Sequence, residues 1–288
     1  MPPSPLRLQG LLGEASRVKS VEIALDNWAG PVRLVLTGDE HLGNAATDES
    51  LIEETTRRLE GEDVYWIDLG DAIDAINMRD PRFDPRSLPD WIGMADLIDL
   101  PAAQVARYRH WFGGLGGNCL ARLYGNHEFE LQRRYERDIY AELNRAIELP
   151  PERALGYSGF VRIRFRNRGG SKNRILDTWT QTIYIHHGCA GGKLMGAKAI
   201  SLERLPGSWD ADIYAVGHSH TRLAFGKPRI GMASKRVATE SHRQIFVNVG
   251  SYMTGLNGYA ERKGYSPQEP GPVELWFYPS ERHVKIIQ

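Results

Sequence analysis

Short apolar runs recur along the chain, and a glycine closes or directly follows the clearest of them. These runs cover residues 32–37, 64–70, 119–125 and 211–217. Apolar runs of this length, bounded by turn residues, are typical of buried strands. The same reasoning predicts a strand at 21–25 joined by a turn to 32–37, a hairpin of 160–166 with 175–185, and strands at 244–252 and in the closing segments VELWFYP and HVKII.

Helical spacing of apolar and charged residues appears between these strands. Residues 48–60 show a helical charge pattern with Asp48 as the expected N-cap, and 129–149 is the longest such segment. Two further helices are expected at 101–112 and near 193–205. Strands alternate with helices in the first half and dominate the second, which predicts a layered α/β architecture with a mixed sheet.

No clean linker divides the chain, so we expect a single domain over residues 1–288. An insert at about 75–118 is rich in proline and aspartate at its start and in aromatic residues later, among them Trp91, Tyr108 and Trp111. The insert lies between two polar motifs described below. Its aromatic side chains either form a lid over the site or pack the insert onto the body.

The charge balance, the cysteine content and the length of the apolar stretches argue against several classes of protein. The 36 basic residues balance the 36 acidic ones, so no global field favours a nucleic acid or a membrane as partner. The two cysteines form no C-x-x-C pair, which is typical of a protein of the reducing cytoplasm. No apolar stretch is long enough to span a membrane. We therefore expect a cytoplasmic protein without a membrane partner, whose oligomeric state the sequence leaves open.

Polar residues gather at the ends of five predicted strands. The five segments are LVLTGDEHLG (34–43), VYWIDLGDAID (64–74), LARLYGNHE (120–128), IYIHHG (183–188) and YAVGHSH (214–220). In open α/β sheets, ligands bind at the carboxyl ends of strands. Imidazole, carboxylate and amide ligands together suit Mn, Fe, Zn or Ni. The number of candidate ligands is too large for one ion and suits two ions that share a carboxylate.

These five segments resemble the calcineurin-like metallophosphoesterase family, whose motifs D-x-H, G-D-x-x-D, G-N-H-E/D, H-G and G-H-x-H occur here in the same order. The resemblance spans residues 33–252. It implies two packed mixed sheets flanked by helices and a pair of metal ions, most often Mn, with Fe, Zn or Ni as alternatives. It also implies hydrolysis of phosphate esters.

Carried over motif by motif, the resemblance assigns two sets of ligands. The first ion is held by Asp39, His41, Asp71 and His220. The second is held by Asp71, Asn126, His187 and His218, so that Asp71 bridges the two. Strand parity does not decide between His186 and His187, and the family pattern favours His187 because it directly precedes the glycine. His127 faces the substrate as a general acid or phosphate contact, and Asp74 orients it.

The substrate is less defined by the sequence. Residues 161–174 place Arg162, Arg164 and Arg166 on one face of a strand, which favours a phosphodiester substrate, either a nucleic acid or a nucleotide. The alternative is an exposed edge strand guarded by charge. Lys193, in a glycine-rich helix entry, is a further candidate phosphate contact. The other functions to weigh are a small-molecule phosphomonoesterase and a metal-bearing binding module without turnover.

Overall fold

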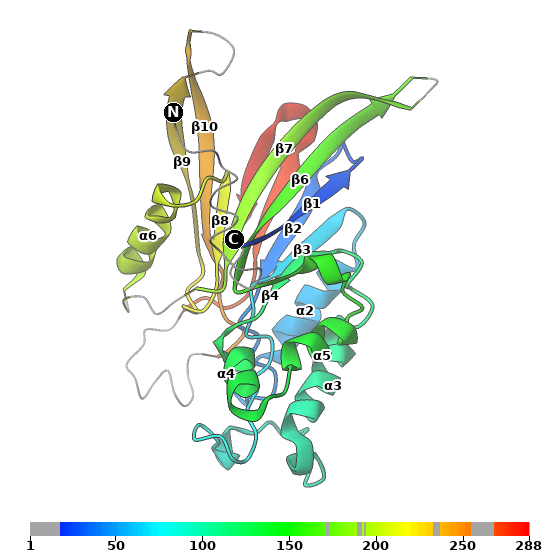
Figure 1. Cartoon of the computed structure of the whole chain (residues 1–288), viewed down its shortest axis with the longest axis vertical. Helices are drawn as coiled ribbons and strands as arrows, with labels where there is room; N and C mark the ends of the chain where they lie inside the picture. The colour runs from blue at the N-terminus through cyan, green and yellow to red at the C-terminus, as the bar shows by residue number, and fades with distance from the viewer. Residues whose placement is uncertain are drawn as a thin grey trace, which may run out of the picture.

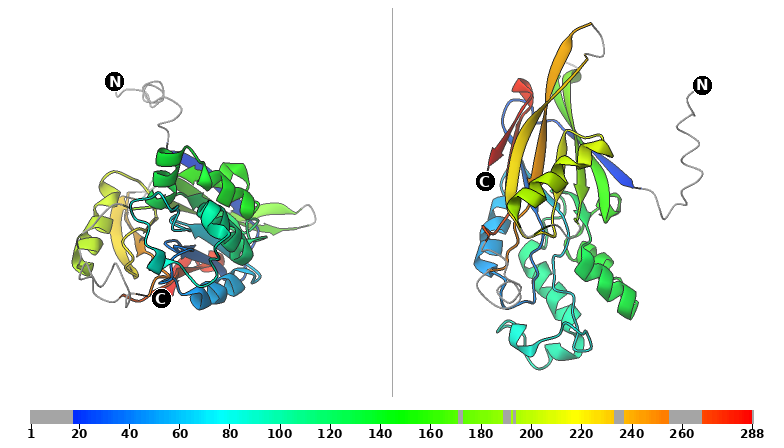
Figure 2. Two further views of the ribbon diagram at one scale, coloured as in Figure 1. Left: turned by 90° about the horizontal axis from the view of Figure 1, so that it is seen from below. Right: turned by 90° about the vertical axis from the view of Figure 1, so that its left-hand side faces the viewer.

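Two six-stranded sheets lie face to face in the computed structural model, with helices on the outer side of each (Figures 1 and 2). The structure describes residues 18–170, 173–188, 192, 194–232, 237–254 and 268–287. The first sheet has the order β1-β6-β7-β8-β10-β9 and the second has the order β12-β11-β2-β3-β4-β5. Both sheets contain parallel and antiparallel pairs, so the predicted fold class is confirmed.

Most of the strands follow the apolar runs of the sequence, whereas β5 and the largely exposed β9 were not predicted. Those of the first sheet are β1 (Lys19–Leu25), β6 (Ser158–Gly169), β7 (Arg174–His186), β8 (Ile213–Val216), β10 (Thr239–Asn248) and β9 (Leu223–Met232). Those of the second sheet are β12 (His283–Ile287), β11 (Val273–Tyr278), β2 (Val32–Thr37), β3 (Val64–Asp68), β4 (Cys119–Leu123) and β5 (Ala154–Gly156). The hairpin of β6 and β7 is antiparallel, as predicted.

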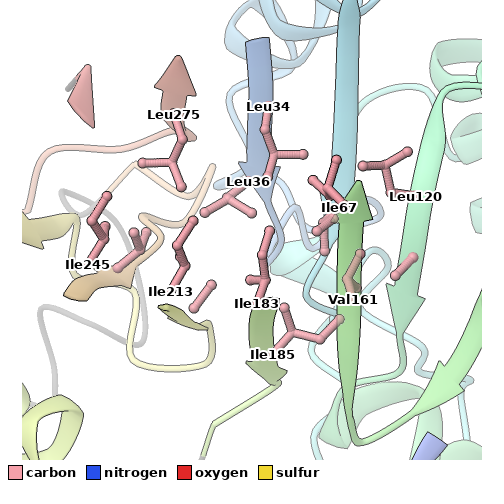
Figure 3. Packing of buried hydrophobic residues seen from close by; sticks show 14 of the residues in the cluster. Leu34, Leu36, Ile67, Leu120, Val161, Ile183, Ile185, Ile213, Ile245 and Leu275 are labelled. Atoms are coloured by element: carbon pink, nitrogen blue, oxygen red, sulfur yellow. The ribbon is translucent and has the colours of Figure 1, made fainter. Parts of the chain in front are cut away.

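The main core fills the space between the two sheets. Leu34 and Leu36 of the second sheet pack toward Ile183 and Ile213 of the first, and all are at most 1% exposed (Figure 3). Because β2 is covered on both faces, its sequence is an almost continuous apolar run rather than an alternating one. In β6, by contrast, buried and exposed residues alternate. The core thus fixes the register that brings the strand ends of both sheets to one edge.

Within the described residues, five α-helices complete the layers. They are α2 (Glu49–Leu59), α3 (Leu100–Phe112), α4 (Asn126–Tyr135), α5 (Ile139–Ala146) and α6 (Met195–Glu203). Short 3-10 turns are η2 (Pro85–Ser87), η3 (Asp96–Asp99), η4 (Pro151–Arg153), η5 (Leu205–Gly207) and η6 (Pro279–Glu281). Asp48 caps α2 as predicted, accepting hydrogen bonds from the backbone N–H groups of Ser50 and Leu51. Within the described ranges, no helix has the length and apolar character needed to cross a bilayer.

Three expectations about the elements need correction. The single helix predicted over 129–149 is two helices, because Glu136 adopts a left-handed conformation (φ 56°) that ends α4, and Asp138 caps α5. The strands β1 and β2 are consecutive but belong to different sheets. The arginine-bearing strand β6 is not an edge strand, since it lies between β1 and β7.

The aromatic residues of the insert face the body of the protein. The indole N–H groups of Trp91 and Trp111 donate to the Glu49 carboxylate at 2.6 and 2.8 Å, and Arg107 forms an ion pair with the same group. Tyr108 is fully buried and donates to Asp68 at 3.2 Å. These contacts favour the alternative in which the aromatic side chains pack the insert onto the body.

We expect the Ile213→Ala variant to lower the free energy of unfolding by about 2–5 kcal/mol, because it leaves a cavity between the sheets. Ile230 on β9 is 73% exposed, and Ile230→Ala serves as the matched control with a change within about 0.5 kcal/mol. Urea denaturation followed by fluorescence measures both. Equal losses in the two variants would contradict the position of the core.

Candidate metal centre

The five polar segments meet at one edge, where β2, β3 and β4 of one sheet and β7 and β8 of the other end. The side chains gather in three groups. Within each group, the possible ligand atoms all lie within 4.8 Å of one another. The groups are Asp39 with His41 and His220, Asp71 with His187 and His218, and His41 with Asp74 and His127. The structure thus brings together the acidic and histidine residues that the motifs single out.

Close backbone contacts hold the first two segments side by side. The N–H of Asp39 donates to the carbonyl of Gly70 at 2.8 Å, and that of His41 donates to the carbonyl of Asp71 at 3.0 Å. Asp39, His41 and Asp71 all have positive φ values, of 57°, 49° and 57°. Aspartate and histidine adopt a left-handed backbone more often than most residues other than glycine, and here it turns the chain sharply at the end of each strand. The turns bring the side chains of the two loops to the same edge.

The second and third polar segments approach each other so closely at Gly125 that only a residue without a side chain fits there. A Cβ atom at this position would collide with the Asp71 carboxylate and with the Asp71 backbone nitrogen. Gly70 faces Gly125 from the opposite side, and a Cβ there would meet the Gly125 nitrogen at 2.6 Å. The two glycines let β3 and β4 end close enough for Asp71 and Asn126 to share one site.

The first donor set consists of nitrogen and oxygen atoms that point at a common position. The Nε2 atoms of His41 and His220 are 3.1 Å apart, and His220 Nε2 is 3.6 Å from Asp39 Oδ1. The other oxygen of Asp39 accepts the N–H of His218 at 2.7 Å, which fixes the orientation of the carboxylate.

The second donor set is arranged around His187. Its Nε2 lies 3.3 Å from Asp71 Oδ2 and 3.1 Å from Asn126 Oδ1, while its Nδ1 donates to the Leu69 carbonyl at 2.7 Å. His186 points elsewhere, since its Nδ1 accepts the N–H of Gly188 at 2.7 Å. The geometry therefore favours His187 over His186 as the ligand.

These residues fit a pair of divalent ions. Ligand atoms that bind one ion at about 2.0–2.2 Å lie roughly 3 Å from one another, close to the separations within both donor sets. Within the described part of the chain, the buried Asp39 Oδ1 has no hydrogen-bond partner. A buried carboxylate oxygen without a donor is costly unless a cation satisfies it. The donor chemistry of imidazole, carboxylate and amide oxygen suits Mn, Fe, Zn or Ni.

Burial and mutual charge shift the pKa values of the site acids in opposite directions. Burial raises the pKa of Asp39 to about 7. Burial also opposes ionisation of Asp71, but the positive charge of His187 outweighs it and holds the pKa of Asp71 well below its usual value. In return, although burial disfavours a charged ring, Asp71 raises the pKa of His187 to about 10. Without a metal ion, a proton on His187 balances the Asp71 charge.

His127 and Asp74 lie beside the first donor set. The Nδ1 atom of His127 is 2.8 Å from the Asp74 backbone carbonyl and 3.5 Å from its carboxylate. The carboxylate is also 3.4 Å from Nδ1 of His41. Because a carbonyl only accepts, Nδ1 of His127 carries the hydrogen and Nε2 is the other, unprotonated nitrogen of the neutral ring. Asp74 thus orients His127 through its backbone as well as its side chain.

Two residues outside the donor sets hold the loops in place, and the first of them, Glu128, was expected from its motif to support the site rather than to bind metal. Glu128 accepts the N–H groups of Asp71, Ala72 and Gly125 at 3.2, 2.9 and 2.9 Å, which ties the second segment to the third. Lys198 of α6 is 7% exposed and donates to the Ser219 carbonyl at 2.6 Å, between the two histidines of the last segment. Glu128 was visible in the motif, but nothing local in the sequence marks Lys198.

The arginines of β6 lie apart from this centre. Arg162 and Arg164 pair with Glu22, at 3.6 and 2.9 Å, and Arg166 pairs with Asp26 at 2.6 Å. Ser158 is the β6 residue opposite His186, so Arg162 is already about 13 Å further along the strand. Lys193 lies outside the described residues. The structure therefore does not bring the three candidate arginines to the metal ligands.

Two phosphoesterases are among the solved structures that this chain resembles. One is a metallophosphoesterase from Sphaerobacter thermophilus, with 13% identity over 90% of this chain and 87% of the other and a TM-score of 0.36. The second is the calcineurin-like phosphoesterase YfkN from Bacillus subtilis, with 9% identity over 89% of this chain and 88% of the other and a TM-score of 0.35. No family model and no curated protein matches the sequence. The functional assignment below rests on the motifs and the site geometry.

We expect metal binding to release protons and to tighten as the pH rises from 6 to 9. The raised pKa of His187 means that its ring is protonated at neutral pH, whereas a metal ligand must be neutral. Calorimetric titration with Mn²⁺ in buffers of different ionisation heat measures the released protons. The variant His242→Ala, which changes an exposed histidine, is the control. A pH-independent affinity without proton release would contradict this arrangement.

Proposed function

We propose that the protein hydrolyses phosphate esters with the aid of two bound divalent metal ions. The observation that carries the proposal is the pair of adjacent donor sets around Asp71. Asp39, His41 and His220 form one set, and the other comprises Asn126, His187 and His218. When bound, such a pair supplies Lewis-acid stabilisation of phosphoryl oxygens and lowers the pKa of water.

The chain's own contribution to the chemistry centres on His127. Burial lowers the pKa of this histidine, so its ring is neutral at pH 7 before substrate arrives. The negative charge of a phosphate ester beside the ring raises that pKa and favours protonation at Nε2. Since Nδ1 is held by Asp74, Nε2 is the atom that can deliver a proton to the leaving oxygen.

Phosphodiester hydrolysis of nucleic acid is the second candidate, and the arginine face of β6 is the observation that favours it. On that face, Arg162, Arg164 and Arg166 present guanidinium groups to solvent, with side chains 54%, 44% and 24% exposed. Their ion pairs with Glu22 and Asp26 offset much of the positive charge that a polyanion would sense. We therefore place this candidate behind hydrolysis of a small phosphate ester.

We expect the Mn²⁺-loaded protein to release p-nitrophenol from p-nitrophenyl phosphate, and Asp71→Asn to lose at least about 100-fold of that activity together with bound metal. Asp177→Asn, which changes a surface carboxylate paired with Arg282, is the matched control and should keep full activity. Parallel assays with bis(p-nitrophenyl) phosphate separate the two substrate classes. Full metal binding without turnover of either substrate would favour a binding module instead.

We expect His127→Gln to lower kcat by about 10²–10⁴-fold while leaving the metal content unchanged, because His127 lies beside the donor sets and transfers a proton. Metal analysis of the purified variant and steady-state kinetics across pH 5–9 measure the two effects. Wild-type activity in this variant would remove the acid role and leave the metal assignment intact.

A further inference from the structure

The insert contains the tripeptide Asp-Pro-Arg twice, at 80–82 and 84–86, and both copies form the same ion-pair fork. In the first, Nε and Nη2 of Arg82 donate to the two carboxylate oxygens of Asp80, each at 2.9 Å. In the second, Arg86 donates in the same way to Asp84 at 3.0 and 2.9 Å. A fork of this kind fixes the plane of the guanidinium and leaves Nη1 for another partner.

The two copies differ in what surrounds them. The side chain of Arg82 is 36% exposed and that of Arg86 is 84% exposed, while the carboxylates that hold them, Asp80 and Asp84, are 0% and 29% exposed. The Nη1 atom of Arg82 lies 3.3 Å from Nδ1 of His127. The first fork therefore places a fixed positive charge against the proposed catalytic histidine, and the second places one in solvent.

The neighbouring imidazole does not satisfy this guanidinium. Nδ1 of His127 carries the hydrogen that it donates to the Asp74 carbonyl, so it cannot also accept one from Arg82. Among the described residues, no carboxylate or carbonyl oxygen accepts a hydrogen bond from Arg82 Nη1. A charged donor is thus left free beside His127, on a side chain that Asp80 prevents from turning away.

We propose that Arg82 binds a phosphate oxygen of the substrate beside His127 and thereby favours phosphomonoesters over diesters; this inference rests on the proposed function. A phosphomonoester carries a charge of roughly −2 at neutral pH and three unesterified oxygens that accept strong hydrogen bonds. A diester carries a single charge and two such oxygens. An additional fixed guanidinium, which donates in plane to phosphate oxygens, therefore stabilises the bound monoester more.

The test compares Arg82→Ala, Arg82→Lys and the matched control Arg86→Ala in the Mn²⁺-loaded full chain. We expect Arg82→Ala to raise KM for p-nitrophenyl phosphate by about tenfold or more, as loss of a charged hydrogen bond does. Inhibition by inorganic phosphate should weaken by a similar factor, and KM for bis(p-nitrophenyl) phosphate should change less. Arg82→Lys should recover part of the loss, and Arg86→Ala should match the wild type.

Two outcomes would overturn the inference. One is a KM for the monoester and an inhibition constant for phosphate that stay within about twofold of wild type in Arg82→Ala. The other is a fall in kcat alone with a shifted pH profile, which would make Arg82 a positioning residue that acts through His127. Calorimetric binding of inorganic phosphate to the wild type and to Arg82→Ala tests the contact without turnover. Inactivity of the wild type on both esters would therefore count against the proposed function, while the phosphate-binding difference would still decide the role of Arg82.

Discussion

The carboxylate of Asp71 is held between the two halves of the site, and its burial determines how the surrounding loops must be built. One oxygen accepts the N–H of His127 at 2.9 Å, and the other faces Nε2 of His187 at 3.3 Å. Only 1% of the residue is exposed, so water cannot stabilise the charge. An ionised group at such a depth persists only with cationic partners and hydrogen bonds. At this site, imidazole rings and backbone N–H groups stabilise the carboxylate, and metal ions bound by the two donor sets would add to that stabilisation.

The layers of the fold make that arrangement possible. The packed faces of the sheets, centred on residues such as Leu36 and Ile183, bring strand ends from residues far apart in the sequence to one edge. The buried guanidinium of Arg122 pairs with Asp68 at 2.5 Å, and its positive charge favours the ionised form of the neighbouring Glu128 carboxyl. Glu128 and Lys198 then fix loops from β3, β4 and β8 by bonding their backbones. The precision of the donor sets therefore comes from residues that are themselves not ligands.

The sequence predicted most of what is local. A strand, a glycine and a candidate ligand lie within a few residues of each other in every motif, so the resemblance to the family's motifs was enough to propose Asp39, Asp71 and His218 as ligands. Contacts between side chains that are far apart in the sequence were not predicted. The charge of Arg164 is compensated by Glu22, which lies on a strand 142 residues earlier and is brought alongside only by the parallel pairing of β1 with β6. The approach of Arg82 to His127 likewise requires the fold of the insert.

In the predicted helix over residues 129–149, tertiary packing also outweighed the local helical pattern. Residues 129–149 keep a helical pattern throughout, yet the backbone turns at Glu136, and α5 packs Ile139 and Leu143 into the helical layer. Burial of those side chains outweighs the continuity of the pattern, which propensity alone does not show. The Asp-Pro-Arg repeat could have been noticed in the sequence, but only the burial of Asp80 distinguishes its two copies.

Anomalous diffraction from crystals of the Mn²⁺-loaded protein tests the central claim most directly. The account predicts two anomalous peaks on either side of the Asp71 carboxylate, one beside His41 and His220 and the other beside Asn126 and His187. A single peak, or peaks away from Asp71, would contradict the shared dinuclear centre on which the proposed function depends.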